Sequence, residues 1–380
     1  MSSPSLLTAD QLDRDLSIRD LTDPAEGPHA IQRLVDGAVE GLASAWSCEV
    51  RWCRGPRVVP ISDNYDCLGF EPDSITRDAR YTRYVDGERM LRSHSSAMVP
   101  PALRGLVETT TADDVLLVCP GVVFRRDAID WQHTGTPHQL DLWRITRRPM
   151  SDVDMDEMIS LLLGALAPSL SWRQVRRVHP YTRHGRQVDV WADDRWVEVW
   201  ECGLAHPAVL GRAGLGSRSG LALGMGLDRL VMLAKGVPDI RLLRSADDRV
   251  ASQMLDLAPY RAVSDMPSVT RDLSIAVDAD EDEETLGDKV RDALGPDASS
   301  VEEVVILSTT PCGLLPAAAQ ARLGARSDQT NVLIRVVLRD LERTLTDDEG
   351  NALRDRIYGA IHRGTEFRWA ATGPGPERRT

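Results

Sequence analysis

Polar side chains that could hold an anion and a small acid gather in the stretch GVVFRRDAIDWQHTGTPHQLDL, which runs from residue 121 to residue 142. An apolar run opens the stretch, a loop with glycine and proline follows, and a second extended piece closes it, so two strands joined by a polar loop are predicted. Guanidinium groups bind phosphates and carboxylates through paired hydrogen bonds. A surface hairpin with ordinary charges would look alike locally, so the rest of the chain must decide. The side chains concerned are Arg125, Asp127, His133, Gln139 and Asp141.

Length and composition predict a protein of two or three domains. The chain has 380 residues, more than one average domain, and its 42% hydrophobic residues suffice for a large core. It contains no run of about 18 apolar residues, which predicts no membrane-spanning helix. The N-terminus, MSSPSLLTADQLDRD, lacks a basic segment followed by an apolar one, so we expect no signal peptide and a cytoplasmic location.

Cysteine spacing and net charge argue against several classes of protein. The six cysteines are scattered without CxxC spacing, so neither disulfides nor a structural metal site is predicted. The formal net charge of −13 argues against broad, non-specific binding of nucleic acid. A local site lined by arginine can still hold a phosphate in an acidic protein.

The elements that must position these side chains follow from hydrophobic periodicity. The small-residue run from Ser219 changes its period midway, which predicts a strand followed by a helix that ends before Gly236. This change places Arg229 in the first turn of the helix. A hydroxyl-rich turn surrounds His94. Further strands are expected over residues 115–119, 176–190 and 196–203, and helices over residues 29–45 and 155–166.

A second unit is predicted after a linker at residues 256–259. Its strands and helices alternate in the order β-α-β-β-α-β, which is the ferredoxin-like pattern, and Thr346 opens a capping box for the second helix. The last strand is expected over residues 365–369. The expected division is residues 1–255, residues 260–371 and a disordered tail over residues 372–380.

Four blocks of the chain resemble one family. The sequence LRSHSS at residues 91–96 is similar to LRTHTS, and WVEVWECGLAHPAVL at residues 196–210 is similar to WxExxGxGMVHPxVL. Residues 123–141 and 221–229 are similar to motifs 2 and 3 of class II aminoacyl-tRNA synthetases. The chain thus resembles the catalytic alpha subunit of phenylalanyl-tRNA synthetase followed by a ferredoxin-fold anticodon-binding domain, as in the single-chain organellar form. A group of ligases related to that enzyme is similar as well.

This resemblance implies an α+β fold, with an antiparallel sheet flanked by helices, and an enzyme that uses ATP and Mg²⁺ to form an acyl-adenylate. Arg125 and Arg229 would be catalytic and would hold the phosphates of ATP. Glu198 would help to position Mg²⁺. The resemblance also implies the remaining site residues. ATP would be bound with the help of Asp127 and His133, and the acid by His94, Ser96, Gln139, Asp141, His179, Tyr181, Ala222 and Gly224.

The departures from the family lie in the side-chain pocket. Where the family has FPFTEPS, this chain reads HPYTRHG, so His179 and Tyr181 replace two phenylalanines and Arg183 stands at an acidic position. Trp200 and Glu201 bring bulk and charge where the family keeps glycine. A phenylalanine pocket relies on aromatic contacts and buried apolar area. The changes indicate a more polar or anionic side chain, or a different acid altogether; the alternative is drift with phenylalanine still bound.

The predicted second unit is acidic. Between Tyr260 and Trp369, 13 Arg and Lys residues stand against 21 Asp and Glu residues. A domain that holds an anticodon stem is expected to present a basic face, so a tRNA partner is weakened although not excluded. A membrane partner is not expected, and the oligomeric state is left open by the weak motif 1, Arg54-Gly55-Pro56.

Three hypotheses follow. The first is an aminoacyl-tRNA synthetase that is most like a phenylalanine-tRNA ligase. The second is a paralogous ligase that forms an adenylate and passes the acid to an acceptor other than tRNA, which the remodelled pocket and the acidic second unit favour. The third is a paralogue without catalysis that binds nucleotide or a partner, and retention of both phosphate-facing arginines speaks against it.

Overall fold

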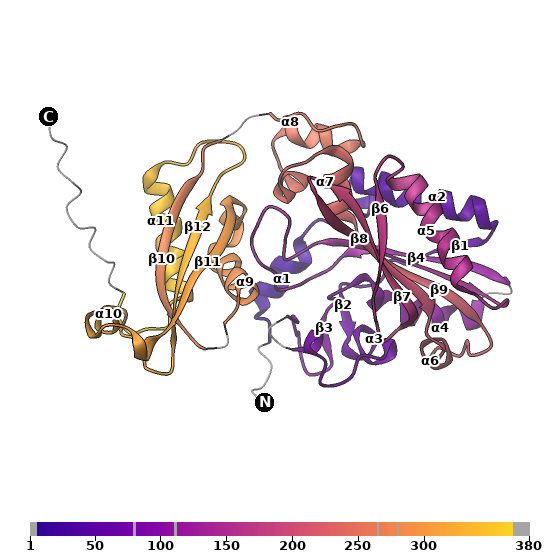
Figure 1. Ribbon diagram of the computed structural model, residues 1–380, viewed down its shortest axis with the longest axis horizontal. Coiled ribbons are helices and arrows are strands. Elements are labelled where there is room, and N and C mark those ends of the chain that lie inside the picture. The colour runs from indigo at the N-terminus through magenta and orange to yellow at the C-terminus, as the bar shows by residue number, and fades with distance from the viewer. Residues whose placement is uncertain (1–5, 79–80, 110–111, 264–265, 280, 368–380) are drawn as a thin grey trace. The chain divides into compact units, whose positions relative to one another are not determined.

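The chain forms two compact units in the computed structural model, which describes residues 6–78, 81–109, 112–263, 266–279 and 281–367. The first unit takes in the chain up to residue 126 and residues 132–263, and the second takes in residues 127–131 and the chain from residue 264 (Figure 1). The predicted boundary at residues 256–259 thus lies slightly before the observed one. The five residues 127–131 lie in the polar loop within residues 121–142, yet they belong to the second unit.

A seven-stranded sheet forms the centre of the first unit. All neighbouring strands in it are antiparallel except the first pair, β1 and β4, which is parallel. This confirms the predicted α+β fold with an antiparallel sheet flanked by helices. In spatial order the strands are β1 (Glu49–Trp52), β4 (Asp114–Val122), β5 (His138–Thr146), β9 (Ser219–Gly226), β8 (Arg195–Ala205), β7 (Thr182–Ala192) and β6 (Trp172–Arg176).

Helices cover one face of this sheet and part of the other. On the first face, α2 buries apolar residues such as Leu34 and Ala38 at helical spacing and packs against α5 and α7. On the other face, Leu103 of α4 packs on Trp143 and its neighbours, at one end of the strands only. The helices of this unit are α1 (Ala9–Ser17), α2 (Ala30–Trp46), α3 (Ile61–Asn64), α4 (Val99–Thr109), α5 (Asp152–Leu166), α6 (Pro207–Arg212), α7 (Leu227–Lys235) and α8 (Asp248–Ala251).

The prediction of one strand over residues 176–190 is wrong. The segment 176–190 is not a single strand but the turn and second arm of a hairpin, in which β6 pairs antiparallel with β7. Pro180 lies in the turn, where its missing N–H costs no ladder hydrogen bond. A short two-stranded sheet of β2 (Val58–Pro60) and β3 (Arg89–Leu91) completes the first unit. None of the helices among the described residues is both long and apolar enough to cross a membrane.

The second unit contains a three-stranded antiparallel sheet in the order β10-β12-β11. Its elements are β10 (Val269–Val277), α9 (Glu283–Leu294), β11 (Val301–Pro311), α10 (Ala317–Leu323), β12 (Thr330–Leu338) and α11 (Asp347–Ile361). Thr346 caps α11 through the predicted capping box. Of the fourth strand expected over residues 365–369, residues 365–367 are not in a strand and the last two lie outside the described residues. The ferredoxin-like assignment therefore stays a prediction.

Residues 127–131 are built into this second unit. Ile129 is buried in its apolar core, and the Ile129 carbonyl accepts a hydrogen bond from Val304 N at 2.9 Å. Arg291 of α9 donates to the carbonyls of Asp127 and Ala128. A Cβ at Gly287 would come within 2.7 Å of the Asp127 carbonyl oxygen, so the close approach of this segment to α9 requires glycine there.

The start of β5 is tied to the start of α7 by a buried network in the first unit. His138 is fully buried, and Asp228 accepts hydrogen bonds from the His138 backbone N–H and from its Nδ1, the latter at 2.9 Å. His138 Nε2 accepts from Leu21 N at 3.1 Å and faces Arg244 Nη2 at 3.0 Å. The ring is thus held by donors on one side and an acceptor on the other, which fixes the strand relative to the helix.

We expect Asp228→Ala to lower the free energy of unfolding by about 3–5 kcal/mol, because the substitution leaves two buried N–H donors of His138 without their charged acceptor. Urea unfolding followed by tryptophan fluorescence measures the change. The control is Glu40→Ala, which removes an exposed carboxylate from α2 and should shift the free energy by no more than about 0.5 kcal/mol. Equal midpoints for the two variants would contradict a structural role for this network.

Candidate active site

The uncovered end of the sheet presents a row of side chains set by strand register. Asp141 of β5 lies opposite Gly224 of β9, and Gly224 lies opposite Glu201 of β8. In the same way Trp143 lies opposite Ala222, which lies opposite Gly203. Cross-strand partners point to the same face of a sheet. The two carboxylates therefore flank a strip of β9 that carries little or no side chain.

Asp141 is a buried carboxylate with several donors. Its Oδ2 accepts hydrogen bonds from the hydroxyls of Ser95 and Ser96, and its Oδ1 accepts from Trp143 Nε1 at 3.1 Å. Burial raises the pKa of Asp141 to about 6, although these hydrogen bonds act in the opposite direction. The adjacent Gln139 accepts from the backbone N–H of Ser95 at 3.1 Å. A buried carboxylate of this kind suits the binding of an ammonium group.

His94 is neutral and offers a donor. Burial, and then the charge of Arg125, lower the pKa of His94 to about 3. Asn64 Nδ2 lies 3.3 Å from His94 Nε2 and can only donate, so the ring proton is on Nδ1. His94 Nδ1 is buried and has no hydrogen-bond partner within the described part of the chain. The site thus holds one unused N–H that an acid could accept from.

Two arginines lie on opposite sides of this end of the sheet. Arg125 follows β4, and its Nε donates to the carbonyl of Ser93 at 3.0 Å, while its backbone N–H donates to Gly135. Arg229 is in the first turn of α7, directly after β9, and makes no hydrogen bond or ion pair with any described residue. The loop after β4 and the period change at Gly226 thus deliver both guanidinium groups to strand ends, where anionic ligands are commonly held.

Glu198 lies near Arg229 on β8. Burial of part of its side chain, and then the charge of Glu201, raise the pKa of Glu198, while Arg229 and Arg177 lower it. Among the described residues, no group of three or more His, Cys, Asp or Glu side chains is arranged to hold a metal ion. Mg²⁺ in nucleotide sites is usually bound by one or two carboxylates and the phosphates. Glu198 is a carboxylate of this kind, and its charged form is disfavoured by burial and by Glu201 until a cation binds.

An aromatic cluster adjoins the row of small residues. Tyr181 stacks with His179 at 5.2 Å between ring centroids and with Trp143 at 6.2 Å, and Phe70 lies 6.1 Å from Tyr181. Phe70 also contacts His94. Burial, and then the charges of Asp141 and Glu201, raise the pKa of Tyr181 well above its usual value, so the phenol is neutral. The cluster gives the side-chain pocket flat walls.

The structure brings most of the residues named from the sequence to this end of the sheet in the first unit. It places His133 in the loop before β5, and it places Asp127 in the second unit, so their roles at ATP stay predictions. Residues that the sequence did not single out are Ser95, Phe70, Trp143 and Arg177. Trp200, which was expected to fill the site, is buried at the opposite face beside Met225. Simple alternation along β8 would put Trp200 on the same face as Glu198, but a bulge at Val199 reverses this.

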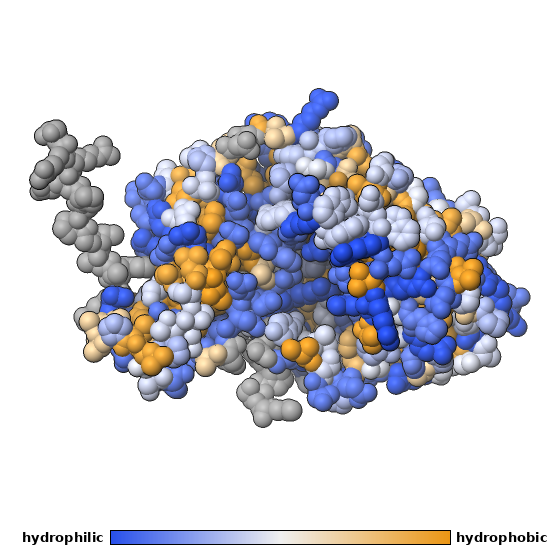
Figure 2. All heavy atoms as spheres, viewed as in Figure 1, coloured by the Kyte–Doolittle hydropathy of each residue, from blue (hydrophilic) through white to orange (hydrophobic). Residues whose placement is uncertain are grey.

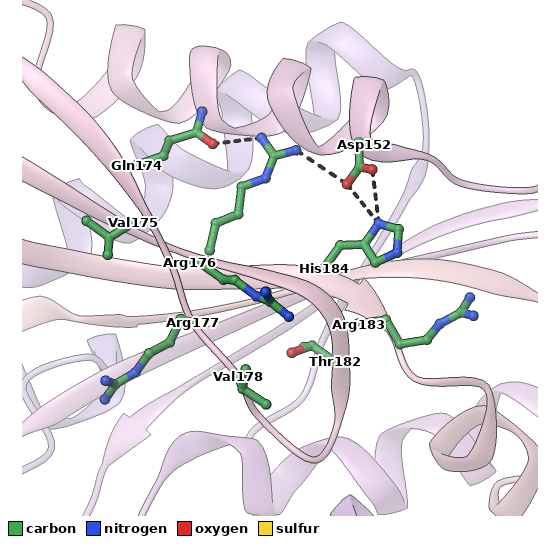
Figure 3. Close-up of a pocket in the computed structure, with 11 residues that line it drawn as sticks. Asp152, Gln174, Val175, Arg176, Arg177, Val178, Thr182, Arg183 and His184 are labelled. Carbon is green, nitrogen blue, oxygen red and sulfur yellow. Dashed lines mark hydrogen bonds and ion pairs between the residues drawn. The ribbon is translucent and has the colours of Figure 1, made fainter.

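A cavity of about 700 Å³ lies at the β6–β7 hairpin (Figure 3). Asp152 of α5 pairs there with His184 and Arg186, and Arg186 also donates to Gln174. Arg176 and Arg183 line the same cavity and make no hydrogen bond or ion pair with described residues. The cavity is therefore positively charged, which contrasts with the acidic chain as a whole.

Comparison with known proteins agrees with this geometry. Residues 19–254 match the family described as tRNA synthetases class II core domain (F), and the chain belongs to this family. The predicted fold and enzyme class, a class II ligase, are thereby confirmed. Two relatives and one solved structure illustrate the extent of the similarity.

The probable mitochondrial phenylalanine–tRNA ligase of Drosophila melanogaster is 26% identical over 362 residues, which cover 80% of this chain and 75% of that protein. The phenylalanine–tRNA ligase alpha subunit of Prochlorococcus marinus (strain MIT 9313) is 32% identical over 241 residues, 62% of this chain and 69% of that protein. A pyrrolysyl-tRNA synthetase structure from Desulfitobacterium hafniense has a TM-score of 0.45 at 16% identity, over 62% of this chain and 78% of that chain.

If Asp141 binds the ammonium group of the substrate, kcat/KM for the amino acid should fall about tenfold per pH unit below pH 6. The reason is that the free enzyme's carboxylate, with its pKa raised to about 6, must be ionised to bind a cation. Initial rates of pyrophosphate exchange from pH 5 to pH 8 measure the profile.

Asp141→Asn should abolish the dependence on this group and lower kcat/KM at pH 8. The matched control is Asp189→Asn, which changes a buried carboxylate that is paired with Arg173 at 2.8 Å and should leave the acidic limb in place. An unchanged acidic limb in Asp141→Asn would assign that limb to another group.

Proposed function

We propose that this protein uses ATP to activate an amino acid as an acyl-adenylate and transfers the acyl group to tRNA, as its phenylalanine–tRNA ligase relatives are named for doing. The observation that carries the proposal is the row Asp141–Gly224–Glu201 with Arg125 and Arg229 at the adjoining strand ends. It combines an acceptor for an ammonium group, a floor without side chains and two cations for phosphates.

The chemistry assigned to the site is displacement at phosphorus. A carboxylate oxygen of the amino acid attacks the α-phosphorus of ATP, an O–P bond forms, and the bond to pyrophosphate breaks. Arg125 would neutralise charge on the α-phosphate and on the attacking carboxylate, and Arg229 would bind the terminal phosphates. Mg²⁺, held with the help of Glu198, would supply further charge neutralisation. In the second step a hydroxyl of the acceptor attacks the acyl carbonyl and AMP leaves.

The protein's contribution to this reaction is positioning and fixed charge. His94 Nδ1 is a donor for the acid, because Asn64 holds the other ring nitrogen. Ser95 and Ser96 orient Asp141 toward the ammonium group. These groups sit on strands or on a short turn that is buried under α4, so little reorganisation is needed when the substrate binds.

We expect Arg125→Ala to lower the rate of amino-acid-dependent ATP–pyrophosphate exchange by about 10²–10³, because the substitution removes a donor to the charge that develops at phosphorus. Arg229→Ala should chiefly raise the KM for ATP. Arg147→Ala is the control, since this arginine pairs with Asp113 at the exposed end of β5. Equal exchange rates in Arg125→Ala and the wild type would contradict the assignment.

A second candidate is a ligase of the same chemistry with an acceptor other than tRNA. One observation favours it: the second unit has 13 basic against 21 acidic residues between Tyr260 and Trp369. On the exposed face of its sheet Arg335 is paired with Asp272 at 2.8 Å, and apolar side chains gather over β11 (Figure 2), where Leu307 is exposed. Neither feature is typical of an RNA-binding face.

The acceptor is decided by comparing exchange with charging. A tRNA ligase is expected to transfer radiolabelled amino acid to total tRNA in a reaction that depends on ATP and is lost in Arg125→Ala. Exchange that proceeds normally while no tRNA becomes labelled would favour the second candidate.

A further inference from the structure

Glu201 forms the second wall of the substrate slot. It lies in the same cross-strand row as Asp141, two strands away, with Gly224 between them. Neighbouring strands are about 4.8 Å apart, so the backbones on either side of Gly224, between which we place the substrate slot, are roughly 10 Å apart. That width accommodates the α-carbon and a side chain of an amino acid. With its ammonium group at Asp141, the side chain of such a substrate extends toward Glu201.

A bulge in β8 turns Glu201 into the slot. Asp189 of β7 pairs with Glu198, and Val188, the residue before Asp189, pairs with Trp200. Val199 is therefore the additional residue on β8. The bulge puts Glu198 and Glu201 on the same face although they are three residues apart. Trp200, which lies between them in the sequence, points to the opposite face, where it is 1% exposed. The bulge thus supplies a carboxylate to the site and no bulk.

Glu201 is charged and its surroundings are incompletely hydrogen-bonded. Arg177 Nε lies 2.7 Å from Glu201 Oε1, and His179 Nε2 forms an ion pair with Oε2. Burial would raise the pKa of Glu201, but the interactions with His179 and Arg177 outweigh it and lower the pKa. Even so, the nearby Thr182 Oγ1 is buried and has no hydrogen-bond partner among the described residues. Such groups normally have partners.

The wall that leads to Glu201 is flat. His179 and Tyr181 are stacked with an angle of 21° between their rings, and Trp143 stacks on Tyr181 at 30°. Thr182 packs directly on Gly203 at the floor of the slot, because a Cβ at Gly203 would lie 2.7 Å from Thr182 Cβ. Position 203 therefore has no room for a side chain between Thr182 and the slot. Planar walls favour a planar side chain, and the polar atoms at the far end call for a polar terminus.

We propose that the substrate is an amino acid whose planar side chain ends in a hydrogen-bond donor, such as a phenol, an imidazole or an indole N–H, and that Glu201 and His179 determine this specificity. The inference rests on the proposed function and names the substrate class of the same site. The donor of the substrate adds a hydrogen bond to the Glu201 carboxylate, which has more lone pairs than its contacts with Arg177 and His179 occupy. Phenylalanine is disfavoured because it buries the polar pair without supplying that hydrogen bond.

Sites that hydrogen-bond a substrate group discriminate strongly against an analogue that lacks it, by about 10⁴–10⁵ in favourable cases. The first test is therefore ATP–pyrophosphate exchange with tyrosine, histidine, tryptophan and phenylalanine, compared by kcat/KM. We expect the best of the three donor-bearing acids to exceed phenylalanine at least 100-fold. A wild-type preference for phenylalanine would overturn the proposal.

Two variants test whether Glu201 and His179 carry the preference. Glu201→Gly, alone and with His179→Phe, removes the charge and the ring nitrogens, and we expect the preference over phenylalanine to fall at least tenfold in the single variant and further in the double variant. Glu201→Gln keeps the volume and should fall between. Thermal unfolding checks that each variant is folded. A preference that is unchanged in folded Glu201→Gly or Glu201→Gln would overturn the role of Glu201.

Calorimetric titration of the wild type with the same four acids separates this inference from the proposed function. If no acid supports exchange, the adenylation proposal fails. The ranking of the four acids by affinity then still tests the proposed specificity. Tighter binding of a donor-bearing acid than of phenylalanine, lost in Glu201→Gly, supports it, and equal or reversed binding refutes it.

Discussion

The register of three antiparallel strands, β5, β9 and β8, is the constraint on which the rest of the site depends. Backbone hydrogen bonds fix Asp141, Gly224 and Glu201 in one row. A slip of one residue in any of the strands would turn its side chains to the helix-covered face. The buried pair of His138 and Asp228 reinforces this register, because it fixes the first residue of β5 against the first turn of α7. Stability and chemistry thus rely on the same contacts.

In the first unit, the local positions of charged side chains matter for the site more than the overall composition does. The chain is acidic, with a net charge of −13, yet cations stand wherever the proposed reaction develops negative charge. Arg125 and Arg229 flank the slot, and unpaired arginines line the cavity at the β6–β7 hairpin. Burial decides the ionisation of the polar groups between them. It keeps His94 neutral and raises the pKa of Asp141 toward the physiological range.

The second unit has its own core, and residues 127–131 contribute to it. Ile129 is buried among apolar residues of α9, β10 and β12, although its neighbours along the chain belong to the first unit. The loop between β4 and β5 therefore contributes residues to both units. Its polar composition alone would place it at the surface of a single unit.

The sequence by itself determined the fold class and the class of enzyme, and it singled out Arg125 and Arg229 as candidates for binding phosphates. Periodicity predicted α2, β4, β8 and the change from β9 to α7, because these elements have one buried face with regular spacing. Sequence blocks around His94, Arg125 and Arg229 pointed to the class of enzyme. These features are local, and local features can be read from neighbouring residues.

Only the tertiary structure decided which residues meet across the sheet. The hairpin of β6 and β7, the bulge at Val199 and the pairing of Glu201 with His179 and Arg177 join residues that are far apart in sequence or shifted in parity. Simple alternation would put Glu198 and Trp200 on one face, but the bulge separates them, so that Trp200 lies in the core while Glu198 shares its face with Glu201. Strand pairing and bulges are set by long-range packing, so alternation along the sequence alone could not have placed these residues.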